Sequence, residues 1–148
     1  MKFSKKSRYG VAALIDLAVN SKNGHVALGS IAERNEISPQ YLEQVFASLR
    51  RAGIVKSVKG SQGGYLLKYP SSSITVASII QALEGTYYLD DEETKTKESA
   101  AGIAETIQED IVDRVNHGLD QILQNLTLAD LEENFQERQS GGQEMYYI

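Results

Sequence analysis

A short stretch of the sequence carries side chains suited to hydrogen-bonding with DNA bases. The residues SPQYLEQVFASLRR combine an N-capping serine, Ser38, with a proline suited to the first helical position. A helix that starts there and stops before Gly53 would place amides, a small residue and arginine on one face. Such groups hydrogen-bond to base edges and phosphates in a major groove. The residues expected on this face are Gln40, Gln44, Ala47, Ser48 and Arg51, with Glu43 and Arg50 on its shoulder.

The other face of the same helix is apolar and would fix its orientation. Its members fall at the spacing of one side of a 3.6-residue helix. They are Tyr41, Leu42, Val45, Phe46 and Leu49. Burial of this face in a core would turn the polar face outward, and an ordinary amphipathic helix with a merely solvated polar face is the alternative interpretation.

A β-hairpin is predicted directly after this helix. Ile54 to Val58 is a β-branched run, Lys59 to Gly64 is a basic, glycine-rich turn, and Tyr65 to Leu67 is a second short strand. Helix and hairpin together predict a winged helix-turn-helix, with the helix in a major groove and the wing tip near a minor groove or phosphates. The tip consists of Lys59, Gly60, Ser61 and Gln62. An ordinary helix followed by an ordinary hairpin is the competing interpretation.

Two helices are expected before this unit. The first runs from about Arg8 to Asn20 and has Lys5 at its entrance, so that Lys5 and Arg8 could contact the DNA backbone. The residues expected to face the core are Tyr9, Ala12, Ala13 and Leu17. A short helix over Ser30 to Asn35 is predicted as the first helix of the helix-turn-helix. His25, between the two, is interpreted as a surface loop residue.

A further helix, capped by Thr75 and ended by Gly85, completes a predicted DNA-binding domain over residues 1–85. An acidic loop follows at 86–99. Residues 100–138 then form a long dimerisation helix to about 124 and a C-terminal helix capped by Thr127, and 139–148 form a flexible tail. The predicted fold class is mainly α (α+β).

The long helix carries one apolar stripe that nothing later in the chain is predicted to cover. The stripe consists of Ile103, Ile107, Ile111, Val115, Leu119 and Ile122. An uncovered stripe of this size is unfavourable in a monomer, so pairing of two copies into a homodimer is expected.

Charge is segregated along the chain. The 148 residues carry a net charge of −5, with 41% hydrophobic and 24% charged residues, a composition typical of globular proteins. Residues 1–69 hold 11 Lys and Arg against 4 Asp and Glu, whereas 70–148 hold 4 against 16. A basic first half suits a phosphate-bearing partner. No signal peptide or membrane-spanning stretch is recognised, so a cytoplasmic protein without membrane association is expected.

Three segments resemble a known family. They are YLEQ at residues 41–44, LRRAGIVKSVKGSQGGYLL at 49–67 and SRYG at 7–10. They resemble the Rrf-type family of bacterial winged-helix transcription regulators, and the likeness runs through residues 1–85. The resemblance implies a homodimer on double-stranded DNA, with contacts that also include Tyr9, Ser38 and Tyr41. Glu43 matches a family position thought to help choose the DNA sequence, whereas Gln40 departs from the serine of some members.

The iron–sulfur members of that family hold their cluster through three cysteines in the region that corresponds to the acidic loop. Here the region contains Asp, Glu, Thr and Lys, and the chain has no cysteine. Cluster binding in that form is therefore excluded, and no cofactor or metal is expected. A hard cation on the acidic run is less favoured than solvated charge, because the spacing matches no cation-binding loop.

The C-terminal sequence QSGGQEMYYI suggests a partner. Met145, Tyr146, Tyr147 and Ile148 resemble the end of the family's cysteine-metabolism repressors, whose partner is cysteine synthase (O-acetylserine thiol-lyase). The resemblance implies that the terminal carboxylate and apolar side chains dock on this enzyme. Packing of the tail on its own dimer is the alternative.

Several functions are compatible with these patterns. The favoured one is a repressor that acts as a homodimer on a palindromic operator, with cysteine or sulfur metabolism genes as candidate targets. The alternatives are a regulator of another pathway controlled by a small molecule, and a winged-helix module that binds protein or RNA. An enzyme is disfavoured, because the chain has no cysteine, only two histidines and no nucleotide-binding loop.

Overall fold

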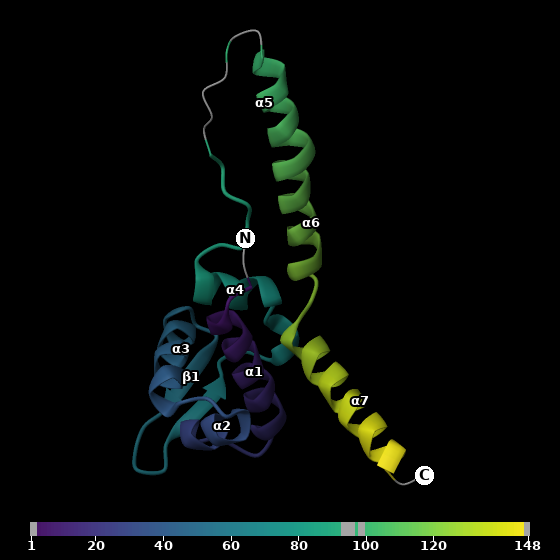
Figure 1. The fold of residues 1–148 in the computed structure, drawn as a ribbon. Coiled ribbons are helices and arrows are strands. Elements are labelled where there is room, and N and C mark those ends of the chain that lie inside the picture. Colours follow the sequence, from purple (N-terminus) through teal and green to yellow (C-terminus); the bar gives the residue numbers. More distant parts are fainter. Residues whose placement is uncertain (1–2, 93–96, 98–99, 147–148) are drawn as a thin grey trace.

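The computed structural model describes residues 3–92, 97 and 100–146 (Figure 1). We call residues 3–85 the head and residues 101–123 the arm. The elements of the head are α1 (Lys5–Asn20), α2 (Leu28–Asn35), α3 (Pro39–Arg51), β1 (Val55–Val58), β2 (Gly64–Leu67) and α4 (Val76–Glu84), with a 3₁₀ turn at Ser71–Ser73. This mainly α fold with one two-stranded antiparallel sheet confirms the predicted winged helix-turn-helix.

The helices of the head begin at side-chain caps. Ser38 Oγ accepts from the Tyr41 amide of α3 at 3.1 Å, and Thr75 Oγ1 accepts from the Ser78 amide of α4 at 3.1 Å, as the sequence indicates. In α1 the cap is Ser4, so this helix begins before the predicted start at residue 8.

Two glycines end helices as predicted. Gly53 follows Ala52, the C-cap of α3, and adopts a φ of 77°, and Gly85, the C-cap of α4, adopts a φ of 84°. This conformation favours glycine, because a side chain would be strained there.

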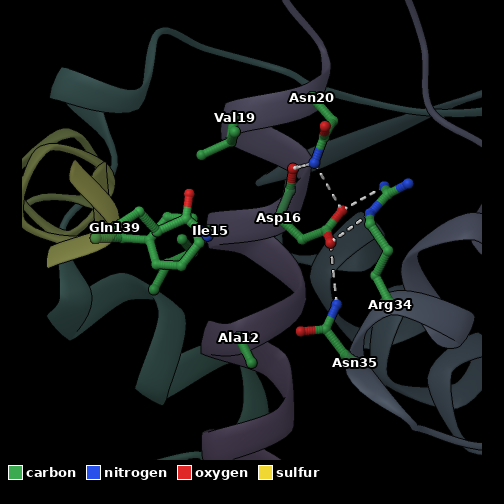
Figure 2. Close-up of a pocket in the computed structure, with 9 residues that line it drawn as sticks. Ala12, Ile15, Asp16, Val19, Asn20, Arg34, Asn35 and Gln139 are labelled. Carbon is green, nitrogen blue, oxygen red and sulfur yellow. Dashed lines mark hydrogen bonds and ion pairs between the residues drawn. The ribbon is translucent and has the colours of Figure 1, made fainter. Parts of the chain in front are cut away.

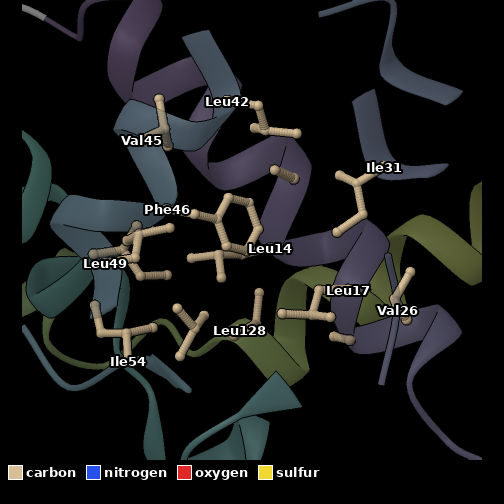
Figure 3. Close-up of a cluster of buried hydrophobic side chains, with 14 of the residues drawn as sticks. Leu14, Leu17, Val26, Ile31, Leu42, Val45, Phe46, Leu49, Ile54 and Leu128 are labelled. Carbon is tan, nitrogen blue, oxygen red and sulfur yellow. The ribbon is translucent and has the colours of Figure 1, made fainter. Parts of the chain in front are cut away.

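A large apolar core holds most of the head together (Figure 3), and a second cluster of buried residues consists of Val76, Ala77, Ile80 and Tyr87. The fully buried members of the large core include Leu14 and Leu17 of α1, Ile31 of α2, and Leu42, Val45, Phe46 and Leu49 of α3. The predicted apolar face of α3 is therefore buried, except that Tyr41 is half-buried. This packing determines which side of α3 is left for solvent.

Tyr9 corrects one expectation, because it does not face the core. Its side chain is 38% exposed and meets the ring of Tyr41 edge-on, with 5.8 Å between centroids. The inward side of α1 is set by close packing on α4. A Cβ built on Gly10 would lie 2.3 Å from Leu83 Cδ1, so a larger residue here would force the Leu83 side chain to move.

The hairpin forms with β1 and β2 paired from Val55↔Leu67 to Val58↔Gly64. An additional antiparallel bridge joins Val26 to Tyr65 of β2. Val26 is thus a third, one-residue partner of the wing.

The arm projects away from the head as a nearly continuous helix (Figure 1). It comprises α5 (Ala101–Ile107), a π-helical segment (Gln108–Asp113) and α6 (Arg114–Leu123). The Gln108 side chain donates through Nε2 to Asp113 Oδ1 at 3.0 Å, which links the two ends of the π-helical segment.

The base of the arm is attached to the chain segment that follows α4. The hydroxyl groups of Tyr87 and Tyr88 both donate to Asp120, the latter at 2.7 Å, and the Leu89 amide donates to Asn116 Oδ1 at 2.8 Å. The start of the predicted acidic loop is therefore packed on the arm, and Tyr87 is buried. Most of the acidic run, at residues 93–96 and 98–99, lies outside the described residues.

The last helix, α7 (Leu128–Tyr146), begins inside the head. Thr127 and Asp130 cap it reciprocally, each accepting from the other's amide at 3.0–3.1 Å. The Val76 amide donates to the Leu126 carbonyl and the Leu128 amide to the Ile74 carbonyl, both at 2.8 Å. Leu128 is fully buried, so the C-terminal helix completes the core of the head.

The flexible tail expected at 139–148 is corrected over its described part. Helix α7 continues through Gly141 and Gly142 to Tyr146, and neither glycine has a positive φ. A glycine inside a helix costs only about 1 kcal/mol relative to alanine, and the flanking Gln and Glu are good helix formers. Tyr147 and Ile148 lie outside the described residues. No helix in the described part of the chain is long and apolar enough to cross a membrane.

Candidate nucleic-acid interface

Helix α3 turns a polar face to solvent beside the wing. Of its predicted site residues, Gln40, Glu43, Gln44, Arg50 and Arg51 are exposed, and Ala47 is half-buried. Four apolar side chains on its other side are anchored in the core, so the orientation of this face is set by packing. Amide, carboxylate and guanidinium groups thus share one outward surface, as major-groove readout requires.

Two hollows flank α3 and gather most of the predicted site residues. One, of about 560 Å³, lies toward the wing and is lined by Glu43, Ala47, Arg50, Lys59, Gly60 and Ser61. The other, of about 320 Å³, lies toward α1 and is lined by Lys6, Tyr41, Gln44, Ala47, Ser48 and Arg51. Ala47 lines both hollows and therefore lies between them on the outward side of α3.

Ser48 does not belong to the exposed face on which the sequence placed it. Its side chain is buried, with 8% of the residue exposed. The Ser48 hydroxyl donates to the Gln44 carbonyl at 3.4 Å and accepts from Arg51 Nη2 at 3.3 Å. Because Ser48 follows Ala47 by one residue, the helix turns its small hydroxyl inward, where it can support the Arg51 guanidinium.

Ser38 and Tyr41 also serve the local structure. Ser38 caps α3, and Tyr41 packs edge-on against Tyr9, so the two tyrosines join the start of α3 to α1. The tyrosine pair lies beside the hollow that contains Gln44 and Arg51.

The N-terminal cations lie on the α1 side of α3. Lys5 and Arg8 are exposed. Arg8 Nε donates to the Phe3 carbonyl at 3.2 Å, and the guanidinium lies 5.0 Å from the centroid of the Phe3 ring. Lys6, which was not among the predicted site residues, lines the hollow with Gln44 and Arg51. The sequence signal that could have identified Lys6 as a site residue was its positive charge next to Lys5.

The wing tip is exposed. Lys59, Gly60, Ser61 and Gln62 all face solvent, and Gly60 adopts a φ of 116°. The tip is closed by a hydrogen bond from the Gly63 amide to the Gly60 carbonyl at 3.1 Å. A lysine and two small polar side chains are therefore presented next to the polar face of α3.

A separate cavity of about 570 Å³ lies between α1, α2 and α7 (Figure 2). Asp16 is the centre of its polar wall. This carboxylate accepts from Arg34 at 2.8 and 2.6 Å and from Asn35 at 3.1 Å, and its hydrogen bond to Arg34 raises the pKa of the arginine. The apolar wall includes Ile15, Val19 and Phe135. No local sequence pattern indicates this cavity, because its residues come from three separate segments.

The fold agrees with that of known proteins. The Rrf2 family, described as an iron-dependent transcriptional regulator, matches residues 3–134. This chain belongs to the Rrf2 family. The HTH-type transcriptional regulator IscR of Yersinia enterocolitica is 38% identical over 138 residues, which cover 90% of this chain and 80% of that protein. The chain is therefore a DNA-binding transcription regulator and not an enzyme.

Solved structures of Rrf2 regulators have the same fold. CymR, the global cysteine regulator of B. subtilis, has a TM-score of 0.76 and 34% identity, covering 90% of this chain and 98% of that one. IscR of T. potens has a TM-score of 0.73 and 39% identity, covering 94% and 91%.

The family description names iron, and the side chains of this chain show whether an iron–sulfur cluster could bind. An iron–sulfur cluster is held by thiolates, and this sequence has no cysteine. Within residues 3–92, 97 and 100–146, no three His, Asp or Glu side chains gather as metal ligands would. The residues present do not fit such a cluster.

Proposed function

We propose that this Rrf2 protein is a repressor that binds a palindromic operator as a homodimer. The observation that carries the proposal is the apolar stripe of the arm. It is exposed in the single chain except at Leu119, which is half-buried and packs against the cluster of Val76, Ala77, Ile80 and Tyr87. The exposed fractions are 63% for Ile103, 51% for Ile107, 53% for Ile111, 39% for Val115 and 64% for Ile122.

A second copy is the simplest cover for this stripe. Apolar side chains that recur along one face of a long helix pack well against the same face of an identical helix related by two-fold symmetry. A two-fold axis at the arms would present two α3 helices to DNA. Their half-sites would then lie about one helical turn, roughly 34 Å, or a multiple of it apart.

Each head would use its parts for different tasks. Gln40, Gln44, Ala47 and Arg51 are proposed to meet base edges, and Glu43 to accept from a cytosine amino group. Lys5, Arg8 and the wing residues Lys59 to Gln62 are proposed to contact phosphates and the flanking groove. All of these residues except the half-buried Ala47 are exposed, which supports this assignment.

Sedimentation combined with selection of bound sequences from random duplex DNA tests the proposal. We expect a dimer at micromolar concentration and selected sequences with dyad symmetry. A monomer that selects a single half-site would contradict it. Transcription from a promoter that carries the selected site should fall when the protein is added, and a rise would identify an activator.

A role in cysteine or sulfur metabolism, with cysteine synthase as co-repressor, is the second part of the proposal. It is supported by the C-terminal sequence EMYYI and by the likeness to CymR, a global cysteine regulator. Met145 and Tyr146 belong to α7, whereas Tyr147 and Ile148, which would dock, lie outside the described residues.

A peptide experiment tests this partner directly. A decapeptide QSGGQEMYYI should bind cysteine synthase, and its C-terminal amide should not, because amidation removes the anionic anchor. Equal binding of both peptides, or of the full chain and a chain lacking Tyr147 and Ile148, would sink the proposal. Control by a small molecule would then be the alternative, with the cavity beside Asp16 as the place to examine.

A further inference from the structure

The tip of the wing extends beyond its own strand pairing. The last paired residues of the hairpin are Val58 and Gly64, so the five residues from Lys59 to Gly63 have no partner strand. Inside the turn, the Gly63 amide donates to the Gly60 carbonyl at 3.1 Å. A short, glycine-rich turn with so few hydrogen bonds would sample many conformations unless another segment restrains it.

The turn between α1 and α2 provides that second segment. Val26 exchanges two backbone hydrogen bonds with Tyr65, at 3.0 and 2.9 Å. A Cβ built on Gly64 would lie 2.3 Å from the Val26 carbonyl oxygen, which shows how closely the two backbones approach. The α1–α2 turn is thus packed along the outer edge of β2.

His25 extends this attachment to the tip. His25 Nε2 lies 2.6 Å from the carbonyl oxygen of Gln62, a residue 37 positions later in the chain. The carbonyl can only accept, so Nε2 must carry the proton. Both the neutral Nε2–H tautomer and the imidazolium have that proton, so the hydrogen bond is available in either charge state.

We propose that His25 is a positioning residue for DNA binding, which holds the turn Lys59–Gly63 in one conformation before DNA arrives. This inference rests on the proposed contact of the wing with DNA. A restrained turn loses less conformational entropy on binding, so its side chains bind more tightly than those of a free turn. His25 acts through Gln62 and need not touch DNA itself.

The surroundings of His25 separate this role from a general structural one. His25 is exposed and contributes nothing to the apolar core, which ends at Val26 on this side. Its removal should therefore leave the unfolding temperature of the head unchanged. The effect should appear in the order of the tip and in DNA affinity.

Three variants test the inference on the full chain. His25→Ala removes the donor, His25→Gln keeps an N–H that can reach a carbonyl, and Asn23→Ala changes an exposed neighbour in the same turn. Hydrogen exchange of the Gly63 amide in the free protein reports the order of the tip. Affinity for a selected operator reports the consequence.

We expect faster exchange at Gly63 and about 2- to 10-fold weaker binding for His25→Ala, the range that a single hydrogen bond supports. His25→Gln should restore most of both, and Asn23→Ala should match the wild type. Unchanged exchange in His25→Ala, faster exchange without weaker binding, or a failure of His25→Gln to rescue would overturn the inference.

Lys59→Ala, measured in parallel, distinguishes this outcome from failure of the proposed function. If Lys59→Ala weakens binding while His25→Ala does not, the wing contacts DNA and only the role of His25 is wrong. If neither variant weakens binding, the proposed wing contact itself is wrong and the inference falls with it.

Discussion

Ile31 in the head and Ile103 in the arm are the same residue type in opposite surroundings. Ile31 is fully buried by α1, α3 and the rest of its own chain, whereas Ile103 is 63% exposed. Ile103 lies on a helical face that the sequence identifies as apolar, and Ile31 lies on the buried side of α2. The difference teaches that apolar periodicity predicts a face to be covered, but does not say whether the same chain or another copy covers it.

The two regions also differ in charge. The head is basic, and the arm is acidic, with Glu105, Glu109, Asp110, Asp113 and Asp120 against one arginine. A basic head is attracted to phosphates, whereas an acidic arm is repelled by them. The charge pattern therefore favours contact with DNA through the head and leaves the arm free for the proposed dimer contact.

The largest expected effect comes from the same truncation made in each region. Phe46→Ala in the head should lower the free energy of unfolding by about 3–5 kcal/mol, because it leaves a cavity in a closed core. Ile111→Ala in the arm should leave the unfolding of the head nearly unchanged. Denaturant unfolding followed by tyrosine fluorescence measures both, and equal losses would show that the arm also belongs to one closed core.

A charge on the arm should break the dimer without unfolding the head. Ile107→Glu combined with Ile111→Glu would place carboxylates on the apolar stripe, and we expect dimerisation to weaken at least about 100-fold, since each buried isoleucine contributes roughly 1.5–3 kcal/mol. Sedimentation measures the dissociation constant. The control is Gln121→Glu, an exposed polar position on α6, and a double variant that remains a dimer would show that the stripe is not the interface.

Arg51 tests which side of α3 reads DNA. Arg51→Ala should cost on the order of 1–3 kcal/mol of specific operator binding if the guanidinium makes a bidentate base contact. Arg138→Ala, on α7 and away from both hollows, is the matched control. Titration of labelled operator measures the difference, and wild-type affinity in Arg51→Ala would place the reading face elsewhere on the helix.

Salt should move the two functions in opposite directions. Raising salt weakens DNA binding, because phosphate contacts release counterions, and Lys59→Ala should flatten that dependence by about one unit. The same salt should strengthen dimerisation slightly, because it screens repulsion between two acidic arms. Sedimentation and operator titration across one salt series measure both slopes. A dimer that weakens with salt would point to ion pairs in the interface.

The smallest effect concerns one carboxyl in each region. Hydrogen bonds from Ser4 and Ser7 lower the pKa of Glu84 in the head, and those from Tyr87 and Tyr88 lower the pKa of Asp120 in the arm. A carboxyl whose pKa is lowered by folding stabilises the folded state at pH values above its ordinary pKa. This contribution is lost as the pH falls through the lowered pKa.

The unfolding free energy of the head should fall as the pH drops below about 4.5, the ordinary glutamate pKa. Glu84→Gln should make this fall smaller. Asp120→Asn should leave that slope unchanged, because its partners lie at the base of the arm. Urea unfolding at a series of acidic pH values compares the two variants. Identical acid profiles for wild type and Glu84→Gln would contradict the role of Ser4 and Ser7.

Most of the candidate interface could be predicted because its signals are local. The boundaries of α3, its caps and its polar face depend on residues within one or two turns of each other, and the wing depends on the glycine-rich turn. The errors concern the direction in which a side chain points and the neighbours that it contacts. Ser48 lies one position too close to the core, Tyr9 faces Tyr41, and Lys6 rather than its neighbours lines a hollow.

The amino-acid sequence by itself determined where α3, α4 and the wing lie, which face of α3 is apolar, and where positive charge accumulates, whereas α1 begins earlier and α7 ends later than its signals indicated. These properties follow from hydrogen-bonding and periodicity over a few residues. Only the tertiary structure decided which distant residues meet. It placed Leu128 in the core of the head, His25 on Gln62 across 37 positions and Ser7 on Glu84 across 77. Such contacts depend on how whole elements pack, and local propensity carries no record of that packing.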